Sequence, residues 1–145
     1  MNETLQYAGF WRRFAAYMID GVIIAFALNQ LGSLFWTLLA LSIEDFSTLR
    51  QYDAVYLLTM SIPFAWVYFS GMESSPLQAT IGKLVIGLRV TDLQGERISF
   101  GRATGRFYAK YLSGMILLIG YLMAGFTQKK QALHDVMAKC LVLRA

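Results

Sequence analysis

The charged residues inside apolar sequence are the first candidates for chemistry in this chain. Arg12, Arg13 and Asp20 lie in the stretch FWRRFAAYMIDG, and the residues from Gly21 to Ile43 carry no charge. Asp20 follows Arg13 by two helical turns on one face, a separation of about 10 Å along a helix axis. The two side chains are therefore too far apart for a direct contact on one straight helix. Each is expected to meet a partner on another element.

Later segments offer partners for both charges. For Asp20 we expect Lys110, Arg106 or the carboxyl-terminal tail, and for Arg13 we expect Asp135 in the segment QALHDVMAKC. An aspartate at the centre of a membrane helix costs about 2.5–3.5 kcal/mol on insertion scales, so such residues usually mark functional sites. Two interpretations stay open. The charges fix the depth and direction of the first helix, or they handle ions.

Cys140 and His134 limit the other kinds of chemistry. They are the only cysteine and the only histidine, which excludes an intramolecular disulfide and leaves a Cys/His metal site without ligands. A lone histidine without a nucleophile supports no mechanism, and we expect His134 in a loop or at an interface. The segment TIGKL lacks the spacing of a phosphate-binding loop. We expect no enzyme, no cofactor and no metal.

Composition indicates a membrane protein. The chain has 145 residues, of which 57% are hydrophobic and 15% charged. A soluble domain of this size carries about 25% charged residues. The net charge of +4 fits cytoplasmic loops rich in Lys and Arg, and no nucleic-acid-binding motif is present.

Three uncharged runs predict three transmembrane helices. They are Gly21–Ile43, Ala54–Met72 and Tyr111–Gln128. A helix needs about 20 residues to cross a hydrocarbon core about 30 Å thick. We place the spans near residues 14–42, 54–72 and 104–127. The first run is too long for a signal peptide, so we expect it to remain in the protein.

The polar stretch between the second and third runs predicts smaller elements. IGKLVIGL has its apolar residues at helical spacing, which is typical of a short helix at the membrane surface. LRVTDLQGERISF alternates around Asp92 and Gly95, which indicates a short hairpin or turn. Ser99 is a suitable cap for a helix beginning near Phe100. We expect the basic residues of its first turns to reach the interface; these are Arg102, Arg106 and Lys110.

The distribution of Lys and Arg predicts the orientation. The 43–53 loop holds one Arg, whereas basic residues are frequent before the first run and in residues 73–110. The positive-inside rule therefore places the amino terminus in the cytoplasm. Three crossings would then export the tail, which is itself basic. A tilted or re-entrant third helix would remove this conflict.

Three sequence blocks resemble one known family. They are GFWRRFAAYMIDG near the start, QATIGKLVIGLRVTDLQGERISFGRATGR in the middle and KKQALHDVMAKCLVL near the end. In order and spacing, from about Tyr7 to Leu143, they resemble the RDD family of small integral membrane proteins. The resemblance places the family's arginine at Arg13 and its two aspartates at Asp20 and Asp135. It implies either exchange of monovalent cations for protons or a role as an accessory subunit.

We therefore expect an all-α membrane protein with a single domain, residues 1–145. It would have three transmembrane helices, plus a short interfacial helix or hairpin between the second and third. The leading hypothesis is exchange of monovalent cations for protons at the cell membrane, with Asp20 as the ion-handling carboxylate. Three helices hardly enclose a pathway, so transport predicts a homo-oligomer or a membrane partner. The alternative is a non-transporting interaction subunit of a membrane complex. We expect no nucleic acid among the partners.

Overall fold

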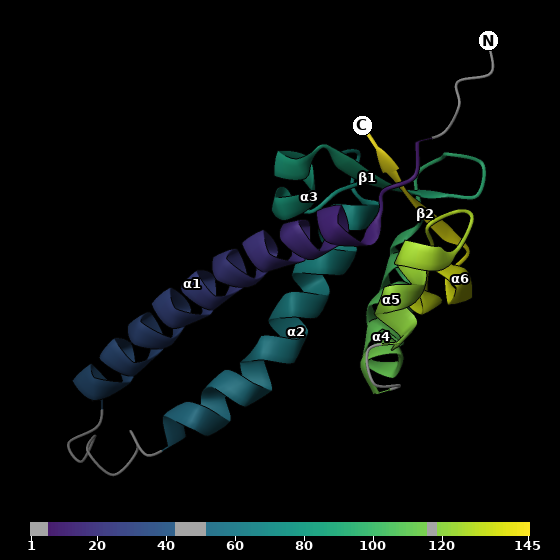
Figure 1. Ribbon diagram of the computed structural model, residues 1–145. Helices are drawn as coiled ribbons and strands as arrows, with labels where there is room; N and C mark the ends of the chain where they lie inside the picture. Colours follow the sequence, from purple (N-terminus) through teal and green to yellow (C-terminus); the bar gives the residue numbers. More distant parts are fainter. Residues whose placement is uncertain (1–5, 43–51, 116–118) are drawn as a thin grey trace. The chain divides into compact units, whose positions relative to one another are not determined.

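The computed structural model describes residues 6–42, 52–115 and 119–145 (Figure 1). Helices predominate, and one small sheet accompanies them. In chain order the elements are α1 (Phe10–Ser42), α2 (Asp53–Ser74), α3 (Ile81–Ile86), β1 (Leu88–Asp92), α4 (Phe100–Met115), α5 (Ile119–Phe126), α6 (Leu133–Met137) and β2 (Cys140–Arg144).

The chain divides into two compact units. The first, which we call the charged unit, combines Met1–Asp20 with Trp66–Ala145. The second, the helix-pair unit, is Gly21–Ala65. Helices α1 and α2 contribute residues to both units, and every other helix and strand belongs to the charged unit.

Among the described residues, two helices are long and apolar enough by themselves to cross a membrane. They are α1, with 33 residues, and α2, with 22 residues. Their outer surfaces carry large apolar side chains open to the surroundings; Phe26 is 68% exposed and Leu41 is 81% exposed. Such exposure is unfavourable in water and natural in lipid. Both helices lie close to the spans predicted near residues 14–42 and 54–72.

The third predicted span, near residues 104–127, is divided between α4 and α5. The directions of these two helices differ by 96°. Together they count as a third crossing only if the bent pair is one span. The start of α4 at Phe100 agrees with the prediction, and Ser99 Oγ accepts a hydrogen bond from the Arg102 backbone N–H at 3.3 Å.

The charged unit contains a two-stranded sheet, so the fold is mostly helical and the all-α expectation is wrong in this detail. Strand β1 pairs antiparallel with β2, in a register that sets Leu88 opposite Arg144 and Asp92 opposite Cys140. The predicted turn follows β1, where the Asp92 N–H donates to the Glu96 carbonyl at 2.9 Å. No hairpin forms within residues 88–100, because β1 pairs with β2 and not with the residues that directly follow it.

The amino-terminal segment lies beside the same sheet. The Ala8 N–H donates to the Val142 carbonyl, and the Arg144 N–H donates to the Gln6 carbonyl, both at 2.9 Å. Around the sheet lies a small apolar core made of Ala8, Ala16, Leu88, Val90, Ile98, Ala103, Cys140 and Val142. Residues 6–8, β1 and β2 are therefore joined by backbone hydrogen bonds.

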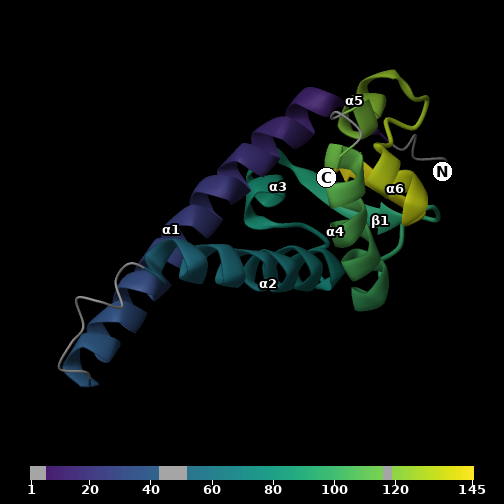
Figure 2. The same ribbon diagram turned by 90° about the horizontal axis from the view of Figure 1, so that it is seen from below.

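Helix α3 begins and ends at residues suited to those positions. Thr80 Oγ1 accepts the Lys83 N–H at the start of the helix, and Gly87 ends it at φ +69°, a left-handed conformation that glycine adopts without steric cost. The short helix predicted in IGKLVIGL is thus confirmed. On the other side of the unit, α4, α5 and α6 pack against one another (Figure 2).

Candidate functional site

Arg13 ties the first helix to the carboxyl-terminal tail. Its Nε donates to the Ala8 carbonyl at 2.9 Å, and Nη2 donates to the Lys130 carbonyl at 2.5 Å. Nη1 forms an ion pair with the Asp135 carboxylate. The partner predicted for Arg13 is therefore confirmed.

Asp135 is fully buried and has donors on both carboxylate oxygens. Besides Arg13, it accepts hydrogen bonds from Arg106 Nε at 2.8 Å and from the Ala132 N–H at 3.1 Å. The last of these closes the first turn of α6. Burial alone would raise the pKa of Asp135, but the guanidiniums of Arg106 and Arg13 outweigh it and hold that pKa well below its ordinary value. Asp135 is a permanent anion and not a solvated tail residue.

Arg106 bridges two buried carboxylates. Its Nη2 lies 2.7 Å from Asp135 Oδ1, and its Nη1 donates to Glu73 Oε2 at 2.5 Å. The side chain is 2% exposed, so the expectation that it reaches the membrane interface is wrong. The physical reason is the pair of carboxylates, which compensates the loss of hydration that normally keeps an arginine at the surface.

Glu73, at the end of α2, is a central residue that the sequence interpretation missed. It is 1% exposed and accepts hydrogen bonds from Arg106 and from Lys83 Nζ, while Lys110 Nζ lies 3.6 Å from its Oε1. One signal was available in the sequence. Glu73 is the only acidic residue between Asp53 and Asp92, and it directly follows the second uncharged run.

Two lysines complete this group, which we call the charge cluster. Burial lowers the pKa of Lys83, and the neighbouring Glu73 opposes that effect. Lys110 lies with its Nζ 4.2 Å from the ring centre of Phe69, on a side of the cluster where that ring also contacts Phe107. The charge cluster consists of Arg13, Glu73, Lys83, Arg106, Lys110 and Asp135.

Asp20 lies elsewhere in the charged unit, at the beginning of α3. Its Oδ1 accepts hydrogen bonds from the Tyr68 hydroxyl at 2.7 Å and from the Gly82 N–H at 2.8 Å, and its Oδ2 accepts the Thr80 hydroxyl at 2.6 Å. Among the described residues, neither Lys110 nor Arg106 pairs with it. That part of the sequence prediction is wrong, because the donors that reach Asp20 are hydroxyl and backbone groups.

The close approach at Asp20 requires glycine at position 82. A Cβ there would lie 2.2 Å from the Ala16 carbonyl oxygen and 2.8 Å from Asp20 Cγ. The next residue, Lys83, extends into the charge cluster. Helix α3 therefore connects the two sites, with one residue bound to Asp20 and its neighbour bound to Glu73.

His134 and Cys140 are both buried, although His134 was expected in a loop or at an interface. His134 is 5% exposed in α6, where its Nδ1 lies 3.3 Å from Ser113 Oγ and its ring packs on Tyr121. Burial lowers the pKa of His134 to about 3, so the ring is neutral near pH 7. Burial raises the pKa of the Cys140 thiol to about 11. Among the described residues, no three His, Cys, Asp or Glu side chains gather as metal ligands.

Comparisons with known proteins identify relatives of this chain by sequence. The sequence model of the RDD family matches residues 7–139. The chain is 36% identical to the uncharacterized protein YxaI of Bacillus subtilis (strain 168), across 94% of this chain and 96% of that protein. It is 30% identical to the uncharacterized membrane protein YteJ of the same organism, across 97% of this chain and 82% of YteJ. No solved structure matches the chain significantly.

The family match covers both the amino-terminal charges and the carboxyl-terminal aspartate, which lie on the separate segments that the fold brings together. It also covers both long apolar helices. The chain is a membrane protein that belongs to the RDD family.

Proposed function

We propose that this protein exchanges monovalent cations for protons across the membrane, and that the charge cluster binds the proton. The observation that carries the proposal is an imbalance of charge. The cluster contains four basic side chains and two carboxylates, all of them largely removed from water. Two carboxylates balance only two cations, and a buried excess of positive charge is costly unless a basic group gives up its proton.

The contacts indicate which basic group gives it up. Arginine does not deprotonate in proteins, which leaves Lys83 and Lys110. Lys83 donates a hydrogen bond to Glu73, whereas Lys110 lies 3.6 Å from that carboxylate and against the Phe69 ring. The less compensated ammonium is the first to become neutral. We therefore assign proton release to Lys110.

In this proposal Asp20 binds the cation. The carboxylate, the Tyr68 hydroxyl and the Thr80 hydroxyl bring oxygen atoms together at one point, and hard cations prefer oxygen ligands. A bound cation would take the place of these two hydroxyl hydrogen bonds, and each hydroxyl would keep its proton and turn its oxygen toward the cation. Helix α3 would carry the change to the cluster, since Gly82 and Lys83 are adjacent residues.

We propose a membrane topology in which α1 and α2 each cross the bilayer completely. Helices α4 and α5 then form a re-entrant pair that enters the bilayer and returns to the same side. The support is the sheet. The segment before α1, strand β1 and strand β2 are hydrogen-bonded to one another, so they share one side of the bilayer. A complete crossing by residues 100–126 would separate β2 from β1. Every Lys and Arg except Arg50 then falls on the side of the amino terminus, which the positive-inside rule assigns to the cytoplasm.

Cysteine labelling tests this topology in a Cys140→Ser background. Gln6→Cys and Ala145→Cys should be protected from an impermeant reagent in intact cells, and Ser47→Cys, which lies outside the described residues, should react. Labelling of Ala145→Cys from outside would restore three full crossings.

Proton flux in liposomes tests the exchange itself. A sodium or potassium gradient imposed on purified protein in liposomes should drive proton movement, read by a pH-sensitive dye trapped inside. Lys110→Met removes the amine and Lys110→Arg keeps a permanent charge, so both should abolish the flux. Arg102→Met is the matched control, because Arg102 is a basic residue of the same helix that is 42% exposed.

Asp20 gives a second, independent arm of this experiment. Asp20→Asn keeps the shape and cannot titrate or carry charge, so it should eliminate flux, and Asp20→Glu should retain part of it. If wild-type protein moves no ions, the exchange proposal fails. The accessory-subunit function then takes its place, to be pursued by co-purification of partners.

A further inference from the structure

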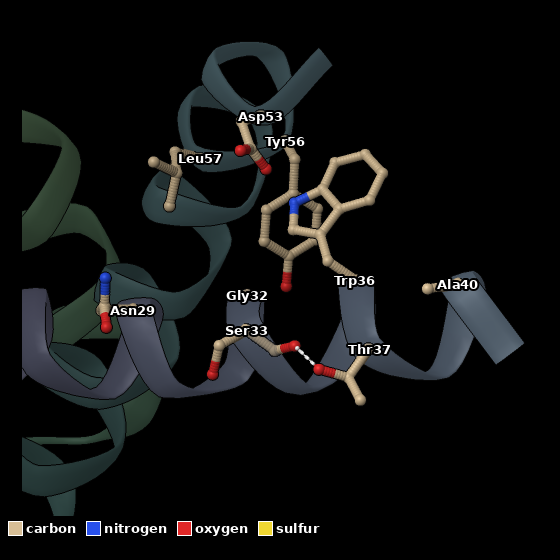
Figure 3. Close-up of a pocket in the computed structure, with 9 residues that line it drawn as sticks. All are labelled: Asn29, Gly32, Ser33, Trp36, Thr37, Ala40, Asp53, Tyr56 and Leu57. Carbon is tan, nitrogen blue, oxygen red and sulfur yellow. Dashed lines mark hydrogen bonds between the residues drawn. The ribbon is translucent and has the colours of Figure 1, made fainter. Parts of the chain in front are cut away.

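The helix-pair unit contains a pocket of about 520 Å³ between α1 and α2 (Figure 3). One wall is a face of α1, and the other is the first turns of α2. The α1 residues are Asn29, Gly32, Ser33, Trp36, Thr37 and Ala40, and the α2 residues are Asp53, Tyr56 and Leu57.

Helix α2 covers only part of this face of α1. The Tyr56 ring lies over Gly32, where an added Cβ would be 3.3 Å from the ring, and it stacks on Phe35 with ring centres 4.9 Å apart. Asn29 lies one turn nearer the start of α1, at one end of the pocket in Figure 3, and its side chain is exposed. The wall is therefore open at Asn29.

The polar groups on this wall, and Gln30 beside it, differ in whether they have hydrogen-bond partners. The Ser33 hydroxyl donates to the Gln30 carbonyl at 2.9 Å, and the Thr37 hydroxyl donates to the Ser33 carbonyl at 2.8 Å. The carboxamides of Asn29 and Gln30 make no hydrogen bond with any residue that the structure describes, and both side chains are exposed. Both lie well inside the long apolar helix α1, where lipid tails offer neither donors nor acceptors.

We propose that a second copy of this chain packs on this face of α1, and that the carboxamides at Asn29 and Gln30 hydrogen-bond to their equivalents across a two-fold axis. A carboxamide is both donor and acceptor, so it is complementary to itself in a way that a charged group is not. Asparagine and glutamine are known to join membrane helices through such bonds. The inference rests on α1 crossing the membrane and is independent of ion exchange.

The open wall suits a second helix in shape as well as in chemistry. Ser33 and Ala40 are small and exposed, so a neighbouring backbone can approach the helix closely on this side. The larger side chains Phe26 and Leu34, which neighbour Gln30 on the helix surface, are exposed and would add apolar contact. A second α1 helix placed here would both hydrogen-bond to the carboxamides and cover the exposed apolar side chains.

Disulfide cross-linking in native membranes tests the contact directly. In a Cys140→Ser background, Asn29→Cys and Gln30→Cys should form cross-linked dimers on mild oxidation. Leu31→Cys, which is 46% exposed at the same depth but about 200° around the helix from Asn29, and Leu58→Cys, which is 71% exposed on α2, are the controls and should remain monomeric. Cross-linking at the control positions alone would place the interface elsewhere and overturn the proposal.

The oligomeric state in nanodiscs or detergent provides the second readout. Wild-type protein should be a dimer by mass measurement, and Asn29→Leu with Gln30→Leu should raise the dimer dissociation constant about tenfold or more. Thr59→Val is the matched control, since its hydroxyl bonds only to its own helix and its loss should leave the dimer intact. A monomeric wild type, or an unchanged dimer in the leucine variant, would overturn the proposal whether or not the protein moves ions.

Discussion

The two units of this protein treat polar groups in opposite ways. In the charged unit, buried charges from α1, α2, α3, α4 and α6 meet in one cluster, and each carboxylate has at least two cationic partners. In the helix-pair unit, hydroxyls bond to the carbonyls of their own helix, and two carboxamides have no partner among the described residues. The buried charges of the charged unit are paired within that unit, whereas two carboxamides of the helix-pair unit need partners from outside it.

This difference indicates which interactions stabilise each unit. The charged unit depends on long-range ion pairs, so removing one partner leaves a buried charge uncompensated. Among the described residues, the only buried side-chain polar atom without a hydrogen bond is Ser70 Oγ. The helix-pair unit depends on lipid and on whatever covers its open face. Substitutions should therefore have large effects in the first unit and small effects in the second.

The largest effect is expected from Arg106→Gln. This change removes the cation shared by Glu73 and Asp135, so both buried carboxylates lose a partner, and the free energy of unfolding should fall by about 3–5 kcal/mol. Thermal unfolding in detergent micelles is the measurement. Arg102→Gln is the control, because its side chain is 42% exposed, and it should change stability by less than about 0.5 kcal/mol. Equal effects at both positions would show that the cluster does not hold the unit together.

Gly82→Ala should come next. The new methyl would overlap the Ala16 carbonyl oxygen at 2.2 Å and push α3 away from Asp20, at a cost of about 3 kcal/mol. Gly105→Ala, in the middle of α4, has nothing within 4 Å of the added methyl. It should stabilise the helix by about 0.5–1 kcal/mol. Chemical denaturation of both variants gives the comparison, and a harmless Gly82→Ala would contradict the close approach of α3 to α1.

Acid should weaken the charged unit through His134, whose pKa in the folded protein is lowered to about 3 from an ordinary 6.5. Between these values the unfolded chain binds a proton that the folded chain refuses, so stability falls as the pH falls below 6.5. The loss should be about 2 kcal/mol between pH 7 and pH 5. Asp135 adds nothing in this range, since its pKa is low in both states. His134→Gln should flatten the dependence, and an unchanged slope would assign it to another group.

The smallest effect is expected in the helix-pair unit. Ser33→Ala removes a hydroxyl that bonds only to the carbonyl of Gln30 on its own helix, so stability should change by less than about 0.5 kcal/mol. The same unfolding assay applies. A loss as large as that of Gly82→Ala would mean that the Ser33 hydroxyl makes essential contacts beyond its own helix, which would erase the contrast between the units.

Some features of the fold are predictable from short stretches. The helices α1 and α2 follow from uncharged runs, and the beginning of α4 follows from Ser99 and the periodicity after it. The contact of Arg13 with Asp135 was also predicted, because an arginine at the beginning of an apolar segment needs a carboxylate partner on another element. These features depend on residues close in sequence or on the need of a charge in apolar surroundings for an opposite charge.

Other features depend on which segments meet. The alternation of residues in LRVTD predicts a strand, and its partner β2 lies at the far end of the chain. Alternation with a period of two is the same whether the partner strand is near or distant in sequence, so it does not identify the partner. Helical spacing shows that Arg106 lies on one face of α4. It does not show that Glu73 and Asp135 lie opposite that face.

Hydrophobicity and the placement of charges therefore identify a membrane protein with long apolar helices, and together with the family resemblance they single out Arg13, Asp20 and Asp135. Hydrophobicity and helix length are local properties, so a single chain reveals them. The packing of distant segments is what places Arg13 and Asp135 in one cluster with Glu73 and binds Asp20 at the start of α3. The physical reason is that burying a charge is favourable only beside its partners, and those partners come from five separate elements.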